Sequence, residues 1–275
     1  MVSGARLRHL VTKSPLKYPI NWIQHRGLQP SDVFVAAYPK SGSTWLRFLI
    51  YQLIRGEPGS FERVNDELPD VGYHAKAPGL LPEGARIIKT HEPYRFSYRR
   101  ALYMVRDPRD IVISEYHYQI WANIITDRMP FDKFFASFLS GKVNRYGAWD
   151  QHVASWLKAR DDGRAEVHVI RFEDMKRNAV EVLGSVAAFL NIPASSSLLD
   201  AIIEANSVQN MRKMEDQARQ GVFKNKSTQT NFVRKGKSGG WRGVLSAHHL
   251  AKLESRFGPI MERLGYALES KTSVL

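Results

Sequence analysis

The stretch YPKSGSTW, from Tyr38 to Trp45, gathers residue types that bind anions. Lys40 offers a positive charge, and Gly42 lets the backbone approach an anion closely. The stretch follows an apolar run, VFVAA, and precedes a run with helical periodicity, and anions bind readily where a strand ends and a helix begins. It therefore predicts a loop that binds a phosphate-like group, with a structural turn carrying a surface lysine as the alternative. Hydroxyl donors in this loop come from Ser41, Ser43 and Thr44.

The loop differs from the Walker A loop of ATPases. The pattern GxxxxGK[ST] is absent, and Lys40 precedes the glycine instead of following it. This difference weakens an ATPase interpretation.

A second stretch, RDPRDIVIS, predicts a strand end followed by a capped helix. Asp107 suits the N-cap, Pro108 the first helical position and Asp110 the third. Arg106 at the strand's end and Ser114, two turns into the helix, are placed to hold a second anion. Plain helix capping is the alternative.

A third stretch, RIIKTHEP, holds a candidate general base. Lys89 and His91 are two residues apart at the end of a predicted strand, so both side chains project to one face. A nearby ammonium disfavours the imidazolium, which keeps His91 neutral as a base must be. The alternative is a histidine that is packed or lies on the surface.

A fourth stretch, RKGKSGGWRG from Arg234 to Gly243, places two adjacent cations beside Gly236. A solvated basic loop is the usual meaning of such a run. Its interest lies in its combination with the other three stretches.

These stretches are positioned by short apolar runs that alternate with helical patterns. This alternation predicts a single α/β domain over residues 1–275, with a central parallel β-sheet flanked by helices in a P-loop-like nucleotide-binding architecture. Residues 1–30 form an N-terminal extension. The predicted strands are Val33–Tyr38, Arg86–Thr90, Leu102–Arg106 and Val167–Phe172. The predicted helices are Trp45–Ile54, Arg109–Trp121, Phe131–Leu139, Trp149–Arg160, Ala179–Leu190 and Ala247–Leu264.

Two stretches carry little core signal and are predicted to be long loops. Residues 58–84 are rich in Pro and Gly, and residues 211–243 are polar and basic. Loops of this length in a compact domain often act as lids or binding segments, and disorder is the competing interpretation.

Composition limits the ligand classes. A formal charge of +13 indicates a polyanionic ligand, and the scattered Lys and Arg argue against nucleic acid. The absence of cysteine excludes thiolate metal sites and a cysteine nucleophile, and without an HExxH pattern we predict no metal. No run of about eighteen apolar residues predicts a membrane span, and no signal peptide is evident, so we expect a cytoplasmic protein.

The four stretches resemble motifs of the cytosolic-type sulfotransferase family, whose sulfuryl donor is 3′-phosphoadenosine 5′-phosphosulfate (PAPS), and they occur along the chain in the family's order. YPKSGSTW is similar to the family's YPKSGTTW, RDPRDIVIS to RNPKDxxVS, KTHEP to KxHLP and RKGKSGGW to RKGxxGDW. FEDM, at Phe172–Met175, is similar to YEDM. The resemblance runs from about Tyr38 to Trp241.

The resemblance implies a donor site and a set of catalytic residues. His91 matches the catalytic base, and Lys40 and Lys89 match lysines that stabilise charge during in-line transfer, with Ser114 beside them. No metal is needed, and adenosine 3′,5′-bisphosphate (PAP) leaves. The implied 5′-phosphosulfate contacts are Lys40, Ser41, Gly42, Ser43 and Thr44. The implied 3′-phosphate contacts are Arg106, Ser114, Arg234, Lys235 and Gly236. The nucleoside contacts assigned with them are Trp45, Phe172, Ser207 and Met211. For Trp45, the alternative is a residue of the hydrophobic core.

The sequence departs from the family pattern at three positions. Phe172 replaces a tyrosine and Val208 an aromatic residue near adenine, so the adenine contacts are weakened more than the phosphate contacts. Gly240 replaces an aspartate, and the KxxxTVxxxE dimer pattern is absent after Trp241, so the oligomeric state is left open.

The acceptor is expected to be a small molecule with a hydroxyl group: a phenol, alcohol, lipid or sugar, with an amine less expected. Aromatic residues in 116–121 and 131–138 either wall an apolar acceptor pocket or belong to the core. A nucleotide kinase-like phosphotransferase and a non-catalytic nucleotide- or polyanion-binding protein remain as alternatives.

Overall fold

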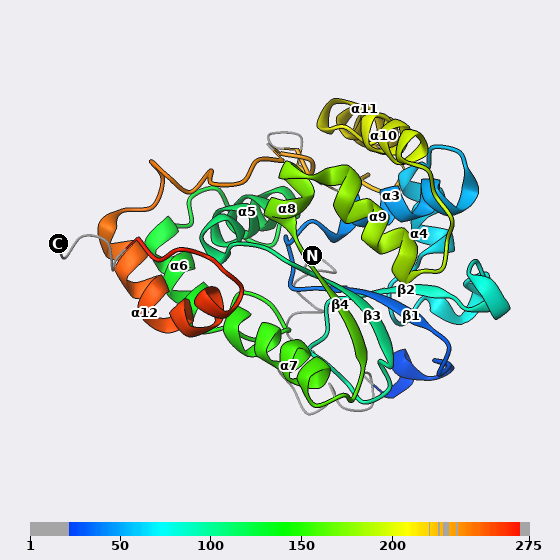
Figure 1. The fold of residues 1–275 in the computed structure, drawn as a ribbon. Coiled ribbons are helices and arrows are strands. Elements are labelled where there is room, and N and C mark those ends of the chain that lie inside the picture. The colour runs from blue at the N-terminus through cyan, green and yellow to red at the C-terminus, as the bar shows by residue number, and fades with distance from the viewer. Residues whose placement is uncertain (1–21, 220, 225, 228–230, 235, 270–275) are drawn as a thin grey trace.

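A four-stranded parallel sheet forms the centre of the molecule. The computed structural model describes residues 22–269 except 220, 225, 228–230 and 235 (Figure 1). The strands follow the spatial order β2-β1-β3-β4, and Val35 lies opposite Lys89 on one side and Leu102 on the other. The strand bounds are Val33–Ala37 for β1, Ile87–Thr90 for β2, Arg100–Val105 for β3 and Glu166–Arg171 for β4.

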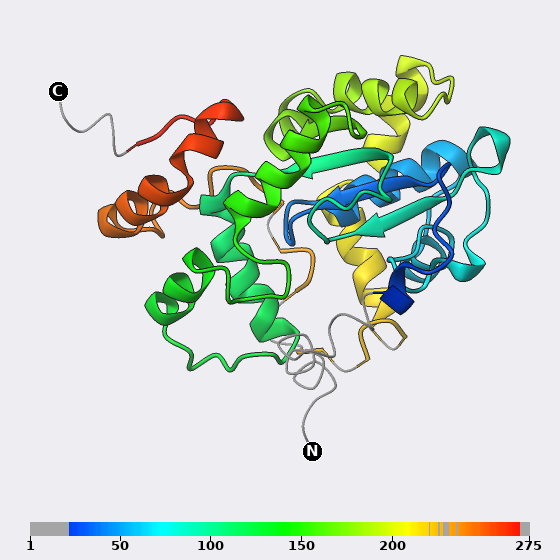
Figure 2. The ribbon, with the colours of Figure 1, turned by 90° about the horizontal axis from the view of Figure 1, so that it is seen from below.

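Helices cover both faces of this sheet (Figures 1 and 2). The helices against one face are α3 (Ser43–Arg55), α4 (Phe61–Glu67), α8 (Phe172–Arg177), α9 (Ala179–Phe189), α10 (Ser196–Ala205) and α11 (Val208–Ala218). Those against the other are α5 (Pro108–Trp121), α6 (Phe131–Leu139), α7 (Trp149–Asp161) and α12 (Ala247–Arg263). Two short 3₁₀ helices, η1 (His74–Lys76) and η2 (Pro82–Gly84), precede β2.

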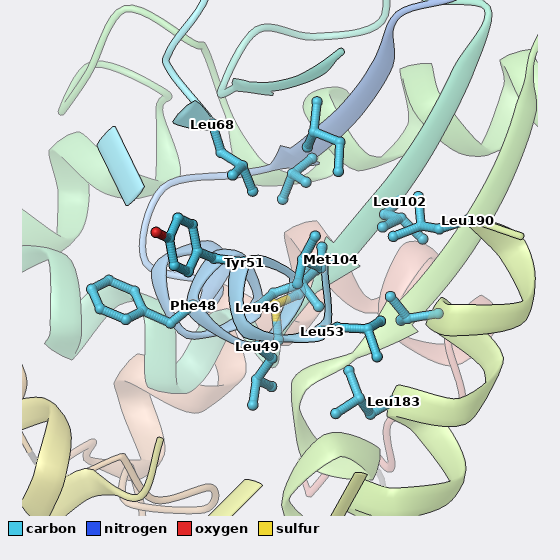
Figure 3. Packing of buried hydrophobic residues seen from close by; sticks show 14 of the residues in the cluster. Leu46, Phe48, Leu49, Tyr51, Leu53, Leu68, Leu102, Met104, Leu183 and Leu190 are labelled. Carbon is cyan, nitrogen blue, oxygen red and sulfur yellow. The ribbon is translucent and has the colours of Figure 1, made fainter. Parts of the chain in front are cut away.

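Alternation along the strands divides the core in two. Val35 of β1 and Met104 of β3 pack under α3, whereas Phe34 and Tyr103 pack on the opposite face. Figure 3 shows part of the first cluster, in which side chains of α3 such as Leu46 lie among those of β3 and α9. Strands buried on both faces explain the near-continuous apolar runs in the sequence and confirm the predicted α/β class.

The prediction that residues 58–84 form a loop was partly wrong, because they contain α4. Ser60 caps this helix by accepting a hydrogen bond from the Arg63 N–H, and Phe61 and Val64 are buried. A seven-residue helix that buries two side chains three positions apart is too short to show periodicity among prolines and glycines.

The prediction of a loop over residues 211–243 was wrong at its start, because α11 continues to Ala218. Its inward face carries Met211, Glu215 and Ala218. The Glu215 carboxylate accepts hydrogen bonds from the N–H groups of Phe232 (2.8 Å) and Val233 (2.8 Å), so a charged residue occupies a core-facing position. Glu215 therefore interrupts the apolar pattern of α11, and its hydrogen bonds hold Phe232 and Val233 against the helix.

Candidate active site

The carboxyl ends of all four strands open into one cavity of about 2210 Å³. The chain passes from β1 to Lys40, from β2 to His91, from β3 to Arg106 and from β4 to Phe172, and each of these residues lines the cavity. Parallel strands bring such residues together because their carboxyl ends share one edge of the sheet.

The loop after β1 adopts a backbone suited to anion binding. Lys40 and Gly42 both have positive φ, 68° and 103°. A Cβ at Gly42 would also lie 2.7 Å from Cδ2 of Phe172, so both conformation and space require glycine there. No side chain caps the N-terminus of the 13-residue helix α3, which leaves its first N–H groups for an anion at Ser43 and Thr44.

The Lys40 ammonium lies against two aromatic rings that the sequence did not indicate. Its Nζ is 4.2 Å from the Tyr118 ring centroid and 4.5 Å from that of Phe232. Burial lowers the pKa of Lys40 to about 8, against the opposing effect of the Glu115 carboxyl. A cation that is poorly solvated in this way favours a bound anion.

Arg106 connects the loop after β1 to the basic segment near the C-terminus. Its guanidinium stacks 4.4 Å above the Phe172 ring and donates to the carbonyls of Lys40 (3.2 Å) and Lys237 (2.9 Å), while its buried Nε has no partner among the described residues. Burial and the neighbouring Arg106 charge lower the pKa of Arg234. Two guanidinium groups that repel each other across a cavity form a natural site for a dianion such as a phosphate.

Asp110 fixes the basic segment against α5. As predicted, Asp107 caps this helix and Pro108 occupies its first position. Asp110, at the third position, accepts hydrogen bonds from the N–H groups of Gly239 (2.8 Å) and Trp241 (3.1 Å). Its role therefore extends beyond the helix start, because it holds Gly239 and Trp241 of the basic segment against α5.

Asp110→Ala is expected to lower the free energy of unfolding by about 1–3 kcal/mol, because one buried and one partly buried backbone donor lose their acceptor. Urea denaturation would measure the change. Asp110→Asn, which keeps one acceptor oxygen, should lose less. Equal stability of Asp110→Ala and the wild type would contradict the role given to this carboxylate.

His91 is held as a neutral imidazole. Its Nδ1–H donates to the Ala37 carbonyl at 2.7 Å, which leaves Nε2 as an acceptor. Burial lowers the pKa of His91 to about 3, and the Lys89 ammonium contributes second. This lowered pKa agrees with the predicted neutral state, with burial rather than Lys89 as its main cause. The Lys89 ammonium is itself paired with Asp70 at 2.6 Å, a partner that the sequence did not indicate.

A buried histidine on α7 positions the backbone of His91. His152 Nε2–H donates to the His91 carbonyl at 3.0 Å, and its Nδ1 accepts from the Tyr103 hydroxyl at 2.9 Å. Burial lowers the pKa of His152 to about 4, which keeps it neutral for this arrangement.

Trp45 also lines the cavity. Its indole N–H donates to the Asn206 carbonyl at 3.0 Å, and its ring meets Phe172 edge-on at 6.1 Å. Gly236 has φ of 56°, and a Cβ there would lie 2.6 Å from Cγ2 of Val208. Trp45, Phe172 and Val208 thus supply aromatic and apolar surface on which a heterocyclic ring could pack.

The structure brings together most of the predicted site. The residues lining the cavity are Lys40, Gly42, Ser43, Thr44, Trp45, Lys89, His91, Arg106, Ser114, Phe172, Ser207, Met211, Arg234 and Gly236. Ser41 is not among them: its N–H donates to the Tyr38 carbonyl at 3.2 Å, and its side chain is fully buried without a partner among the described residues. Lys235 lies outside the described residues.

The two aromatic stretches have different roles. Tyr118, in the first, lines the cavity. In the second, Phe134, Phe135 and Phe138 belong to the core under the sheet and none of them lines the cavity. The helical spacing of the second stretch thus reflects packing.

Within the described part of the chain, no three His, Asp or Glu side chains are grouped so as to hold a metal ion. No described helix has the length and apolar character needed to cross a membrane.

The sequence is similar to a known protein family and to individual proteins. The family model described as "Sulfotransferase domain" matches residues 30–265. Sulfotransferase 4A1 of Mus musculus is 31% identical over 189 residues, which span 64% of this chain and 66% of that protein, slightly less than two thirds. Sulfotransferase 1B1 of Canis lupus familiaris is 26% identical over 289 residues, covering 94% of each chain.

Solved structures show the same fold. Retinol dehydratase in complex with androsterone and inactive cofactor PAP superimposes with a TM-score of 0.69 at 21% identity, covering 87% of this chain and 83% of that chain. Mouse sulfotransferase SULT7A1 complexed with PAP gives a TM-score of 0.65 at 23% identity, covering 88% of each chain.

Proposed function

Because the chain belongs to the sulfotransferase domain family, we propose that it transfers a sulfuryl group from PAPS to a hydroxyl group of a small molecule, releasing PAP. The observation that carries the proposal is the single cavity that contains the uncapped N-terminus of α3, the Arg106–Arg234 pair and the neutral His91. One polyanion with two separated charged groups fits the first two features.

The donor would be held at both ends. Lys40, Ser43, Thr44 and the N–H groups of α3 would bind the 5′-phosphosulfate, and the 3′-phosphate would lie between Arg106 and Arg234, joined by Ser114, Lys235 and Gly236. Trp45, Phe172, Ser207 and Met211 would contact the nucleoside. Ser41 would shape the loop without contacting the phosphosulfate, because its N–H donates to the Tyr38 carbonyl and its side chain is buried away from the cavity.

The transfer itself would be an in-line displacement at sulfur. The acceptor oxygen forms a bond to sulfur while the bond from sulfur to the phosphate oxygen breaks, and PAP leaves with that electron pair. His91 Nε2 accepts the acceptor's proton, and Lys40 and Lys89 stabilise the charge that moves to the leaving oxygen. Fixed ammonium groups would here do the work of the metal ions in many phosphoryl-transfer sites.

The acceptor is proposed to be a small hydroxyl-bearing molecule. Androsterone and retinol, named in complexes of the structural neighbour retinol dehydratase, support this class. The cytoplasmic location inferred from the sequence remains a prediction.

PAP is expected to stabilise the protein selectively over ADP. At a concentration about a hundredfold above Kd it should add about 2.7 kcal/mol, or roughly 5 °C in Tm, because it binds only the folded chain. Thermal unfolding with each nucleotide measures this. Arg234→Ala should lose most of the PAP shift, whereas Arg242→Ala, a matched change at an arginine outside the cavity lining, should keep it.

An equal or larger shift with ADP would favour the kinase-like alternative. A PAP shift without any sulfuryl transfer to hydroxyl acceptors would favour the non-catalytic binding protein.

A further inference from the structure

Several polar side chains line the same cavity as His91. Asp70, Glu92, Asn144, Arg145 and Tyr146 all line it. The charged side chains among them form ion pairs within the protein. Arg145 Nη2 lies 3.1 Å from Glu92 Oε1, and Asp70 pairs with Lys89. Their charges are therefore already balanced.

Glu115 is the exception in this wall. It follows Ser114 on α5, lines the cavity and is only 2% exposed. Its Oε1 accepts a hydrogen bond from Gln119 Nε2 at 3.1 Å, but its buried Oε2 has no partner among the described residues. A buried carboxyl oxygen without a hydrogen bond is costly, so a ligand that donates to it gains more than it would at the surface.

The unpaired oxygen is not reserved for Lys40. Glu115 acts electrostatically on Lys40, but among the described residues no ion pair within 4.0 Å joins them, and the ammonium lies on the rings of Tyr118 and Phe232. In the proposed reaction that ammonium binds the donor, so Glu115 is not needed to neutralise it.

Residues 144–146 pass close to both Glu115 and His91. The Asn144 amide lies close enough to the Glu115 carboxyl to lower the pKa of that carboxyl, but no hydrogen bond within 3.5 Å joins them, and Asn144 Nδ2 donates to the Tyr38 hydroxyl at 3.1 Å. Two residues later, the Tyr146 ring lies 5.6 Å from the His91 ring. Residues 144–146 thus lie beside both the carboxyl and the proposed base, and all of these line the cavity.

We propose that Glu115 determines acceptor specificity: it accepts a hydrogen bond from a second donor group, a hydroxyl or an ammonium, on a molecule whose reacting hydroxyl faces His91. This inference rests on the proposed function and makes it more specific. It predicts that the acceptor is a polar small molecule with two hydrogen-bond donors, rather than a molecule that is hydrocarbon apart from its reacting hydroxyl.

Three para-substituted phenols test the inference: 4-ethylphenol, 4-(2-hydroxyethyl)phenol and tyramine, each also with one methylene fewer and one more. They share ring and reacting hydroxyl, and differ in whether the side chain ends in methyl, hydroxyl or ammonium. Binding to the PAP-saturated protein is measured by calorimetry, and kcat/KM for sulfation is measured with PAPS. The wild type should prefer a hydroxyl or an ammonium over the methyl terminus by roughly tenfold or more.

The variants identify Glu115 as the source of this preference. Glu115→Leu should reduce the preference to about twofold or less. Glu115→Gln, which is isosteric, should keep a preference for the hydroxyl terminus but lose one for the ammonium. Glu204→Gln, at a glutamate elsewhere in the cavity lining, should behave as the wild type.

The outcomes separate this inference from the proposed function. Failure of the wild type to bind PAP would overturn the proposed function and this inference with it. PAP binding together with no preference, with a preference that survives in Glu115→Leu, or with no binding of any of the phenols would overturn the inference alone. PAP binding by Glu115→Leu shows that the variant is folded.

Discussion

His91→Ala is expected to lower kcat for sulfuryl transfer by about 10²–10⁴-fold while leaving the affinity for PAP nearly unchanged. The imidazole is oriented by the Ala37 carbonyl and kept neutral by burial, so it is ready to accept a proton at Nε2. None of the groups proposed to hold PAP depends on this ring. Steady-state kinetics and calorimetry with PAP together measure the two effects.

The pH dependence of kcat is a second test of the role of His91. Because the pKa of His91 is about 3, the base is already neutral throughout pH 5–8 and should produce no acidic limb there. His168→Ala, at a histidine outside the cavity lining, is the matched control and should retain kcat. Equal turnover by His91→Ala and the wild type would remove His91 from the mechanism.

Lys40→Met is expected to lower kcat by about 10²–10³-fold, since methionine keeps much of the side chain's length but removes the charge. A fixed ammonium in a poorly solvated site stabilises the charge that develops on the leaving oxygen more strongly than it would in water. Single-turnover measurements with saturating PAPS isolate this step from donor binding. Lys158→Met, at an exposed lysine of α7, should leave the rate unchanged.

The lowered pKa of Lys40 also fixes the direction of an alkaline limb. The charged form predominates below pH 8, so kcat/KM should fall as the pH rises through about 8. In the donor complex the bound anion raises this pKa, so the limb in kcat should lie at higher pH. The limb near pH 8 should disappear from the residual activity of Lys40→Met, and its persistence there would assign it to another group.

The sheet and the helices that cover it follow closely from apolar patterning. All four strands occur within one or two residues of their predicted bounds, since strands buried on both faces must be apolar throughout. The helix after β3 could be predicted almost to the residue because Asp107 and Pro108 have strong positional preferences. The short α8 and the helix α10 are not predicted by the sequence analysis.

The missed features are those in which a residue's role depends on partners distant in sequence. Asp110 reads as a residue of the first helical turn, yet its carboxylate binds a segment about 130 positions further along the chain. Neither the rings of Tyr118 and Phe232 around Lys40 nor the unpaired oxygen of Glu115 has a local signal. The spacing of Tyr118 four residues after Ser114, on the same helix face, is the one indication that could have placed it at the site.

The strand order of the sheet also determines when, during synthesis on the ribosome, a chain becomes able to hold its nucleotide. The loop after β1 is made early, but β3, Phe172 and Arg234, which complete its surroundings, emerge only later. Until β3 emerges, β1 presents an unpaired edge, and such edges expose nascent chains to aggregation. A nucleotide that needs both Lys40 and Arg234 stabilises only finished molecules, so its cellular concentration would select full-length chains over truncated ones.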